Sequence, residues 1–495
     1  MAGTTYRLKA VPAVLGTISL PEMANPHKAR VIVREPVKVA LVALGCVKNL
    51  VDSEKMLGAL AEAGAVITAD EADADVIVIN TCGFLQLARA EAHEVIAEAV
   101  ARKRAGRCRR VVVAGCLVQR DGRRLLRDVP GIDALVGVHR RDDVVRAALA
   151  ALDHDAKPPG RKHRPAPDLY LGEYHPHVAL DTARLRLTPR HYAYLRISEG
   201  CDQKCTFCTI PAIRGPMHSK PVEIVLAEAR ELVADGVREL NLIGQDTTGY
   251  GRDIGYKPGL AGLLRRLDRL EGLRWIRLLY AYPSMFTDAM IEAIAECDKV
   301  VKYVDIPLQH IDDRMLKAMG RRVTRVRTEQ LLRRLGERIA GVAIRTTLIA
   351  GFPGETESEF EELLDFVSQA KFAAVGVFPY SLEPDTPAGR MKGQLTEQIR
   401  RQRVDAIMRT QQRIAFAEAR RQKGRQFEVL IDERASRGRF AARHAGQAPE
   451  VDAVTYVQGQ TLRVGQFVRV RCVGAKGYDL IARPSSAILP PNRET

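Results

Sequence analysis

The stretch ISEGCDQKCTFCTIPAIRG, residues 197–215, carries three cysteines within eight positions, directly after a short apolar run. Iron–sulfur clusters are held by Cys thiolates, normally four to a 4Fe–4S cube. Cys201, Cys205 and Cys208 supply three, so one iron would stay open to a small molecule, as in a catalytic zinc site that keeps an open position. A zinc site completed by His218, or three ordinary buried thiols, is the alternative interpretation.

Apolar strand candidates alternate with helical segments from Tyr192 onward. The candidates are residues 193–199, 237–244, 274–281, 302–308, 342–351 and 374–381. Six successive β/α units predict an open or partial barrel of parallel strands, with its active site at the carboxyl ends of the strands. The three cysteines follow the first of these strands. A long basic helix without a cap is predicted from Leu395 to about Gln422.

Three further cysteines end predicted strands in the N-terminal part of the chain. Continuous apolar strands at 38–46, 74–82 and 109–116, separated by helices, predict a parallel α/β sheet that is buried on both faces. Cys46, Cys82 and Cys116 would then meet at the carboxyl edge of the sheet, where open α/β folds bind ligands. This placement favours a second three-thiolate cluster over ordinary core cysteines. A dinucleotide fold is disfavoured, because the G-x-G-x-x-G fingerprint is missing.

The remaining chain changes character after the long helix. FEVLIDE, DAVTYVQ, QFVRVRCVG and GYDLIARP are short period-two strands split by Gly-containing turns, which predict a small antiparallel barrel of the oligonucleotide-binding type. Cys108, Cys297 and Cys472 lack a comparable setting and are interpreted as structural. The predicted domains are an extension (1–36), an α/β domain (37–152), a Pro-rich linker (153–190), the partial barrel (191–424), and the small barrel with its tail (425–495).

The length and composition indicate a multidomain enzyme. Its positive charge indicates either an anionic partner or only a solvated surface in a protein set that is rich in arginine. The chain has 495 residues, of which 46% are hydrophobic, and a formal net charge of +16. We expect no membrane span and no secretory signal, and therefore a cytoplasmic protein. Nine cysteines are too few for a disulfide scaffold in a chain of this length, so the clustered thiols are interpreted as metal ligands.

The motifs together resemble the radical S-adenosylmethionine (SAM) methylthiotransferase family. The matching stretches are residues 197–215, LGCVKNLVDSE (44–54), INTCGF (79–84), AGCLVQR (114–120) and GFPGETESEF (351–360). The resemblance implies two 4Fe–4S clusters, one on Cys201, Cys205 and Cys208 that binds SAM, and a second on Cys46, Cys82 and Cys116. It implies that the final barrel is a TRAM domain that grips substrate, and that the electron donor is of flavodoxin or ferredoxin type.

Family chemistry and the SAM contacts also follow from the resemblance. The first cluster would reduce SAM to a 5′-deoxyadenosyl radical that removes hydrogen from an unactivated carbon. The second would carry the sulfur that is methylated and delivered to that carbon. Gly244, Gln245 and Gly351 end barrel strands at positions where this superfamily contacts SAM, although glycine there also suits a turn. His310 is interpreted as a hydrogen-bonded wall residue rather than a proton handler.

Two substrates divide the family, an aspartate of small-subunit ribosomal protein S-twelve and an adenosine of transfer RNA. GQDTTGYG (244–251), YVDIPLQH (303–310) and APEVDAVTYV (448–457) favour methylthiolation of the aspartate β-carbon, a post-translational modification. Residues 425–495 carry 11 Arg and Lys against 7 Asp and Glu, which is typical of RNA-binding modules and favours an RNA contact. A third hypothesis is a non-catalytic RNA-binding protein with structural metal.

Overall fold

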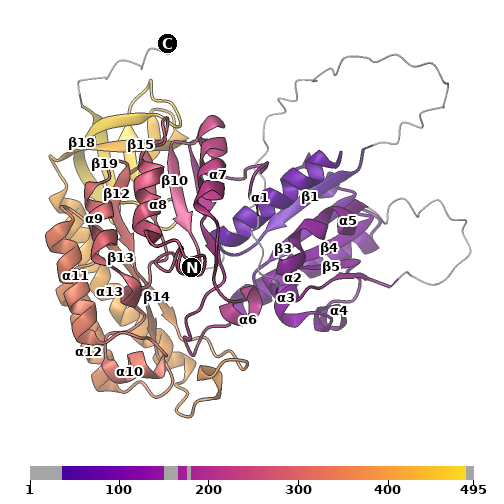
Figure 1. Ribbon diagram of the computed structural model, residues 1–495, viewed down its shortest axis with the longest axis horizontal. Coiled ribbons are helices and arrows are strands. Elements are labelled where there is room, and N and C mark those ends of the chain that lie inside the picture. Colours follow the sequence, from indigo (N-terminus) through magenta and orange to yellow (C-terminus); the bar gives the residue numbers. More distant parts are fainter. Residues whose placement is uncertain (1–35, 150–165, 175–179, 486–495) are drawn as a thin grey trace, which may run out of the picture. The chain divides into compact units, whose positions relative to one another are not determined.

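The computed structural model describes residues 36–149, 166–174 and 180–485 (Figure 1). They form two compact units. The first contains the described residues up to 174 together with Ala183–Leu187, and the second contains residues 180–182 and 188–485. Within these residues, no helix is both long enough and apolar enough to cross a membrane. The predicted extension at 1–36 lies almost entirely outside the described residues.

A six-stranded parallel sheet organises the first unit. Its strands are β1 (Lys38–Ala43), β2 (Val66–Thr68), β3 (Val76–Thr81), β4 (Arg110–Gly115), β5 (Ala134–Gly137) and β6 (Asp168–Tyr170), in the order β2-β1-β3-β4-β5-β6. The helices are α1 (Val47–Glu62), α2 (Gln86–Arg104), α3 (Cys116–Asp121), α4 (Arg124–Asp128) and α5 (Val144–Leu149). β1, β3 and β4 are neighbours, so the ends of the three predicted strands do lie side by side.

Both faces of this sheet are buried, as the continuous apolar strands predict. Ile77 and Ile79 of β3 pack with Ile96 of α2 on one face, whereas Val76 and Val78 belong to the cluster on the other face with α1 and α5. The α/β prediction is confirmed. β6 falls inside the segment predicted to be a linker, where Asp168–Tyr170 pairs with β5 through only three residues. A strand this short has no detectable period in the sequence.

The second unit contains a parallel six-stranded sheet with the order β14-β13-β12-β11-β10-β7. Its strands are β7 (Tyr192–Arg196), β10 (Glu239–Ile243), β11 (Trp275–Leu278), β12 (Val300–Asp305), β13 (Ala343–Ala350) and β14 (Ala374–Pro379). The six β/α units therefore form as predicted. The principal helices that pack on the sheet are α7 (Val222–Ala234), α8 (Gly259–Asp268), α9 (Asp288–Glu296), α11 (Arg325–Arg338), α12 (Glu357–Ala370) and α13 (Glu397–Arg421).

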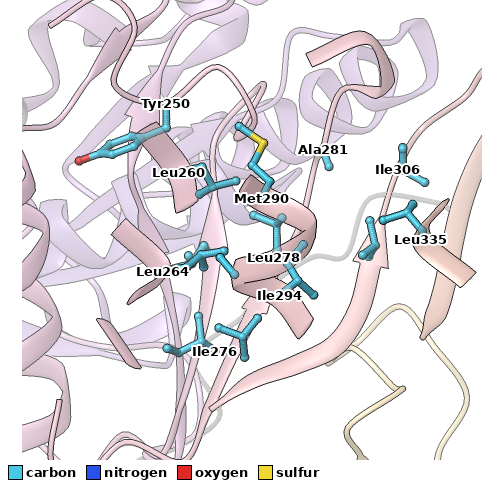
Figure 2. Packing of buried hydrophobic residues seen from close by; sticks show 14 of the residues in the cluster. Tyr250, Leu260, Leu264, Ile276, Leu278, Ala281, Met290, Ile294, Ile306 and Leu335 are labelled. Carbon is cyan, nitrogen blue, oxygen red and sulfur yellow. The ribbon is translucent and has the colours of Figure 1, made fainter. Parts of the chain in front are cut away.

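Alternate residues of these strands point to opposite sides of the sheet. Ile276 and Leu278 of β11 pack against Leu264 of α8 and Ile294 of α9 in the main apolar core (Figure 2). The residue between them, Arg277, is fully buried on the opposite, inner side. Tyr194, Asn241, Tyr303, Asp305 and Arg345 share this inner parity on their own strands. The interior of the partial barrel is therefore polar and buried.

The long helix differs from its prediction in one respect. α13 spans Glu397–Arg421, and the Thr396 hydroxyl accepts a hydrogen bond from the backbone N–H of Ile399. The expectation of a capless helix was wrong, because Thr396 is a regular N-cap residue. α13 packs along β14 and leads directly into the C-terminal barrel.

The C-terminal barrel forms as predicted and is closed, with the strand order β15-β16-β17-β19-β18, but one neighbouring pair, β17 and β19, is parallel rather than antiparallel. The strands are β15 (Gln426–Ser436), β16 (Arg439–His444), β17 (Thr455–Gln458), β18 (Phe467–Lys476) and β19 (Asp479–Pro484). Arg443 of β16 ties this barrel to the parallel sheet: its guanidinium lies 2.7 Å from Asp432 and 2.7 Å from Glu239, the first residue of β10. Glu239 also accepts from Arg277 at 2.9 Å. The two β structures are joined by buried charges.

Removal of the Arg443 charge is expected to destabilise the second unit. Arg443→Met leaves the fully buried Glu239 with one cation fewer, and breaking a buried ion pair from one side costs about 3–5 kcal/mol. Urea unfolding of the variant measures the loss. Arg439→Met on the same strand is the control, since Arg439 is exposed over the ring of Tyr456 and such contacts contribute only about 0.5–1 kcal/mol. Equal losses in both variants would contradict this account.

Candidate functional site

The loop with Cys201, Cys205 and Cys208 follows β7 and the two-residue strand β8 (Ser198–Glu199) at the carboxyl end of the second sheet. Its start is fixed by hydrogen bonds from Cys201 N to Gly215 O (3.1 Å) and from Met217 N to the Asp202 carboxylate (2.9 Å). Gly200 has φ 76°, and a β-carbon there would lie 2.0 Å from Pro216 O. Only glycine fits at this point without backbone movement.

The end of the loop is fixed by a different set of contacts. Thr206 donates to Ala318 O through its hydroxyl (2.8 Å) and to Met319 O through its backbone N–H (2.9 Å). Phe207, the aromatic before the last cysteine, packs edge-on against Phe352 with ring centroids 6.5 Å apart. The three thiols therefore project from a loop that is anchored at both ends.

Unsatisfied buried polar atoms gather beside this loop. Ser198 Oγ, Gln245 Oε1 and Tyr282 Oη have no hydrogen-bond partner within the described chain. Ser198 Oγ would lie 2.6 Å from a β-carbon on Gly244, and Gln245 Nε2 donates to Glu199 at 2.6 Å. A ligand that carries amino, carboxylate and hydroxyl groups, as SAM does, would satisfy such atoms. Gly244 and Gln245 thus lie next to the cysteine loop, directly after β10.

Gly351 lies at the same edge, directly after β13. Its backbone N–H donates to the Glu355 carboxylate, and a β-carbon would lie 2.5 Å from the Arg400 side chain. His310 is fully buried nearby: its Nδ1 accepts from Asp312 N at 3.1 Å, and its Nε2 lies 3.9 Å from Glu355. Nδ1 is therefore hydrogen-bonded, Nε2 has no hydrogen-bond partner among the described residues, and the wall role of His310 stays a prediction. The SAM contacts of Gly244, Gln245 and Gly351 stay predictions.

The electrostatics of the loop are set by burial and by two arginines. Burial raises the pKa of Cys201 to about 11 and of Cys208 to about 12, so binding of iron must displace both protons. Burial would also raise the pKa of Glu199, but Arg214 and Arg196 hold that pKa at about 2. Glu199 is therefore an ionised carboxylate two residues before Cys201.

Arg321 brings a positive charge next to a cysteine that is predicted to bind the cluster. Its guanidinium lies 3.5 Å from Cys205 Sγ, stacks over the Tyr282 ring at 4.0 Å and donates to Pro307 O at 2.5 Å. Burial raises the pKa of Tyr282 to about 12 despite this cation, so the phenol stays protonated. Neither residue lies in one of the sequence motifs, so neither could be predicted as part of this site.

Cys46, Cys82 and Cys116 lie at one edge of the first sheet, as predicted. Cys82 directly follows β3 and Cys116 directly follows β4, while Cys46 precedes α1. A β-carbon on Gly45 would lie 3.3 Å from Cys82 Sγ, and one on Gly83 would lie 2.6 Å from Cys116 O. The three loops touch one another only because small residues flank the cysteines.

One side chain contacts all three of these loops. Asn49 Nδ2 donates to Leu44 O (3.0 Å), two residues before Cys46, and to Thr81 O (2.7 Å), one residue before Cys82. Asn49 Oδ1 lies 3.5 Å from Cys116 Sγ. Asn80 supports this arrangement by donating to Asn49 O at 2.9 Å and to Ser53 Oγ at 2.8 Å. Asn49 lies in the stretch LGCVKNLVDSE (44–54), but its partners are backbone atoms that a sequence does not reveal.

Neither cysteine trio is drawn together tightly. In the described part of the chain, no three His, Cys, Asp or Glu side chains are grouped so that they could hold a metal ion. The support for iron–sulfur clusters therefore comes from the type of donor and from the hydrogen bonds that hold each loop. Each edge presents three thiols from well-anchored loops, which is the donor set that 4Fe–4S clusters use. The residues present are chemically suited to such clusters.

Three known families match separate parts of the chain. Residues 38–137 match the uncharacterized protein family UPF0004, residues 195–367 match the radical SAM superfamily, and residues 424–484 match the TRAM domain. A solved radical SAM methyltransferase, TsrM from Kitasatospora setae with cobalamin and a [4Fe-4S] cluster bound, is similar with a TM-score of 0.51 and 16% identity, over 72% of this chain and 74% of that one. This likeness shows the fold alone.

Curated relatives are much more similar. The ribosomal protein uS12 methylthiotransferase RimO of Anaeromyxobacter sp. (strain K) is 45% identical over 92% of this chain and 95% of its own length. RimO of Geobacter sulfurreducens is 43% identical over 90% of this chain and 98% of its own length. The fold and these relatives define a radical-SAM methylthiotransferase, with SAM and 4Fe–4S clusters as cofactors. Within that class, the chain belongs to the RimO family.

Loss of the Asn49 amide is expected to empty the N-terminal cysteine site. Asn49→Asp keeps the size of the side chain but cannot donate to Leu44 O and Thr81 O, and an unsatisfied buried carbonyl costs about 1–3 kcal/mol. Iron per reconstituted chain should fall from roughly eight atoms to roughly four. Asp133→Ala is the control, since Asp133 bonds Val111 N (2.8 Å) at the opposite edge of the sheet. Retention of all the iron by Asn49→Asp would refute the role.

Neutralising Arg321 is expected to make a cluster bound by Cys201, Cys205 and Cys208 harder to reduce. A nearby buried cation favours the more negative, reduced cluster, so Arg321→Met should lower its reduction potential by roughly 50 mV. Redox titration followed by electron paramagnetic resonance measures the shift. Arg314→Met, which removes an exposed cation paired with Glu359, is the control. An unchanged potential in Arg321→Met would show that the guanidinium does not act on the cluster.

Proposed function

We propose that this chain transfers a methylthio group to the β-carbon of an aspartate in ribosomal protein uS12. The observation that carries the proposal is the similarity to RimO relatives, which are 42–45% identical over about 90% of the chain. The stretches at 244–251, 303–310 and 448–457 support the same substrate. The positions of the cysteines support the same chemistry, because each trio lies at the carboxyl edge of a parallel sheet.

Each cysteine trio has its own task in this proposal. Cys201, Cys205 and Cys208 hold the cluster that binds SAM, and Cys46, Cys82 and Cys116 hold the second cluster. Bound SAM and the clusters supply radical formation, sulfur and the methyl group. The chain orients these groups and excludes water: Gly244, Gln245 and Gly351 contact SAM, and the anchored loop at 200–217 fixes the first trio.

Domain limits and partners complete the proposal. The domains are an N-terminal extension (1–36), the methylthiotransferase domain (37–152), a linker (153–190), the radical-SAM domain (191–424) and the TRAM domain with its tail (425–495). Electrons come from a flavodoxin or ferredoxin type of donor. Since the substrate is a ribosomal protein, the enzyme acts in the cytoplasm on or near the ribosome.

RNA contact is supported by the surface of the TRAM barrel. Exposed Arg439 stacks over Tyr456 at 3.7 Å, and Tyr478 is 41% exposed beside Phe416. Arginine next to an accessible aromatic ring is a common way to bind RNA bases. This surface fits ribosomal RNA beside uS12, and it also supports transfer RNA adenosine as the second candidate substrate.

The test offers both substrates to the reduced, reconstituted enzyme. The enzyme is incubated anaerobically with SAM and sulfide, with uS12 and bulk transfer RNA in separate reactions, and the products are analysed by mass spectrometry. We expect a methylthio group on one aspartate of uS12 and none on the RNA. Methylthio-adenosine in the transfer RNA, with unmodified uS12, would overturn the proposed substrate.

Two variants separate the roles of the cysteine trios. Cys205→Ala should abolish 5′-deoxyadenosine formation, whereas Cys82→Ala should still cleave SAM but fail to insert sulfur. Cys108→Ala and Cys297→Ala are the matched controls, because both thiols are buried in apolar clusters near the amino ends of strands and should leave both reactions intact. If Cys205→Ala still forms deoxyadenosine, the assignment of the SAM-binding cluster is wrong.

A further inference from the structure

The C-terminal barrel reaches into the polar interior of the partial barrel through one loop, residues 445–452. Arg277, on the inner side of β11, donates to Ala445 O at 2.7 Å. Tyr303, on the inner side of β12, donates to Asp452 Oδ2 at 2.8 Å. Asp452 also accepts from Ala448 N at 2.8 Å, which fixes the shape of the loop. The loop therefore forms part of the wall of the catalytic barrel.

Asp452 connects this loop to the buried guanidinium of Arg345. Its side chain is only 6% exposed, and Asp452 Oδ1 lies 3.4 Å from Arg345 Nε. Arg345 in turn donates to Asp305 Oδ1 at 2.8 Å through its other end. One guanidinium is thus held between a carboxylate of the C-terminal barrel and a carboxylate of β12. The position of Asp305 depends on both.

Asp305 holds a strained residue at the end of β11. Asp305 Oδ2 accepts from Tyr280 N at 3.0 Å, and Tyr280 has φ 59°, which non-glycine residues rarely adopt. Such a conformation persists only when its surroundings enforce it. Tyr280 O accepts two hydrogen bonds from Thr247, through the backbone N–H (3.1 Å) and the hydroxyl (3.1 Å). Tyr280 therefore helps to fix the turn at 246–248 that follows β10.

That turn contacts the cysteine loop directly. Asp246, the neighbour of Thr247, accepts from Gln203 Nε2 at 2.9 Å. Gln203 stands between Cys201 and Cys205. Asp246 is itself fixed by Thr248, whose backbone N–H (3.0 Å) and hydroxyl (2.6 Å) donate to its other oxygen. An ion pair, hydrogen bonds and the backbone between Asp246 and Thr247 thus connect Asp452 in the C-terminal barrel to the loop that carries the thiols.

We infer that Asp452 is a positioning residue for the SAM-binding cluster, acting through Arg345, Asp305 and Tyr280 on the turn at 246–248. The C-terminal barrel then does more than grip substrate, because one of its carboxylates shapes the catalytic loop. This inference depends on the proposed ligand role of Cys201, Cys205 and Cys208. Cys205→Ala in the same assay tests that role separately.

The test uses Asp452→Asn in the full-length, reconstituted enzyme. The amide has the same size, but in either orientation its NH₂ group faces a donor, Arg345 Nε or Ala448 N–H. We expect reductive SAM cleavage without any acceptor substrate to fall about tenfold, since small misplacements near reacting groups cost large factors in rate. Hydrogen exchange should quicken at the amides of Thr247 and Tyr280.

Asp432→Asn is the matched control. Asp432 is also an acid of the C-terminal barrel, but its partners are Arg443 (2.7 Å) and His191 (2.8 Å) rather than Arg345. It should lower the unfolding temperature without slowing SAM cleavage or exchange at 246–248. Asp452→Glu, which restores the carboxylate, should recover part of the rate. Wild-type exchange and wild-type cleavage in folded Asp452→Asn would overturn the inference.

Discussion

The structure depends on the rule that parallel strands end at a common edge. Cys46, Cys82 and Cys116 are 36 and 34 residues apart, yet β1, β3 and β4 are neighbours, and their loops meet. In the second unit, Cys201, Gly244 and Gly351 likewise follow β7, β10 and β13 of one sheet. The apolar strands that build the two cores therefore also determine which side chains can act together. Fold and site have the same cause.

Sequence patterns revealed the apolar strands and the cysteines but not the polar groups that fix them. A buried strand is a continuous apolar run, and a thiol trio has a recognisable spacing, so both can be predicted locally. Asn49 bonds two carbonyls on loops 5 and 32 residues away, and Arg321 reaches Cys205 across 116 residues. Such partners are defined only after the strands are ordered. β6 was missed for another reason, since three residues give no period.

The structure gives the stretch at 448–457 a different role from the one that the sequence suggests. In the sequence it indicates the substrate branch, which suggests direct contact with substrate. In the fold, Asp452 is buried against Arg345 and Tyr303 of the catalytic barrel. This part of the stretch therefore holds the C-terminal barrel against the catalytic barrel. Asp432 holds the C-terminal barrel at a separate point, through Arg443 and His191.

The buried ion pairs that hold the TRAM barrel also affect the charge of its exposed surface. A count of residues treats all acids and bases alike, but Asp432 and Asp452 are paired with buried arginines, and Arg443 is paired with Asp432 and Glu239. Two acids and one base are thereby withdrawn from the surface, so the exposed face is more basic than the count of 11 against 7 indicates. A basic protein substrate gains nothing from such a face. Phosphates attract arginines, so a basic face of this kind is better suited to the proposed contact with RNA than to a basic protein.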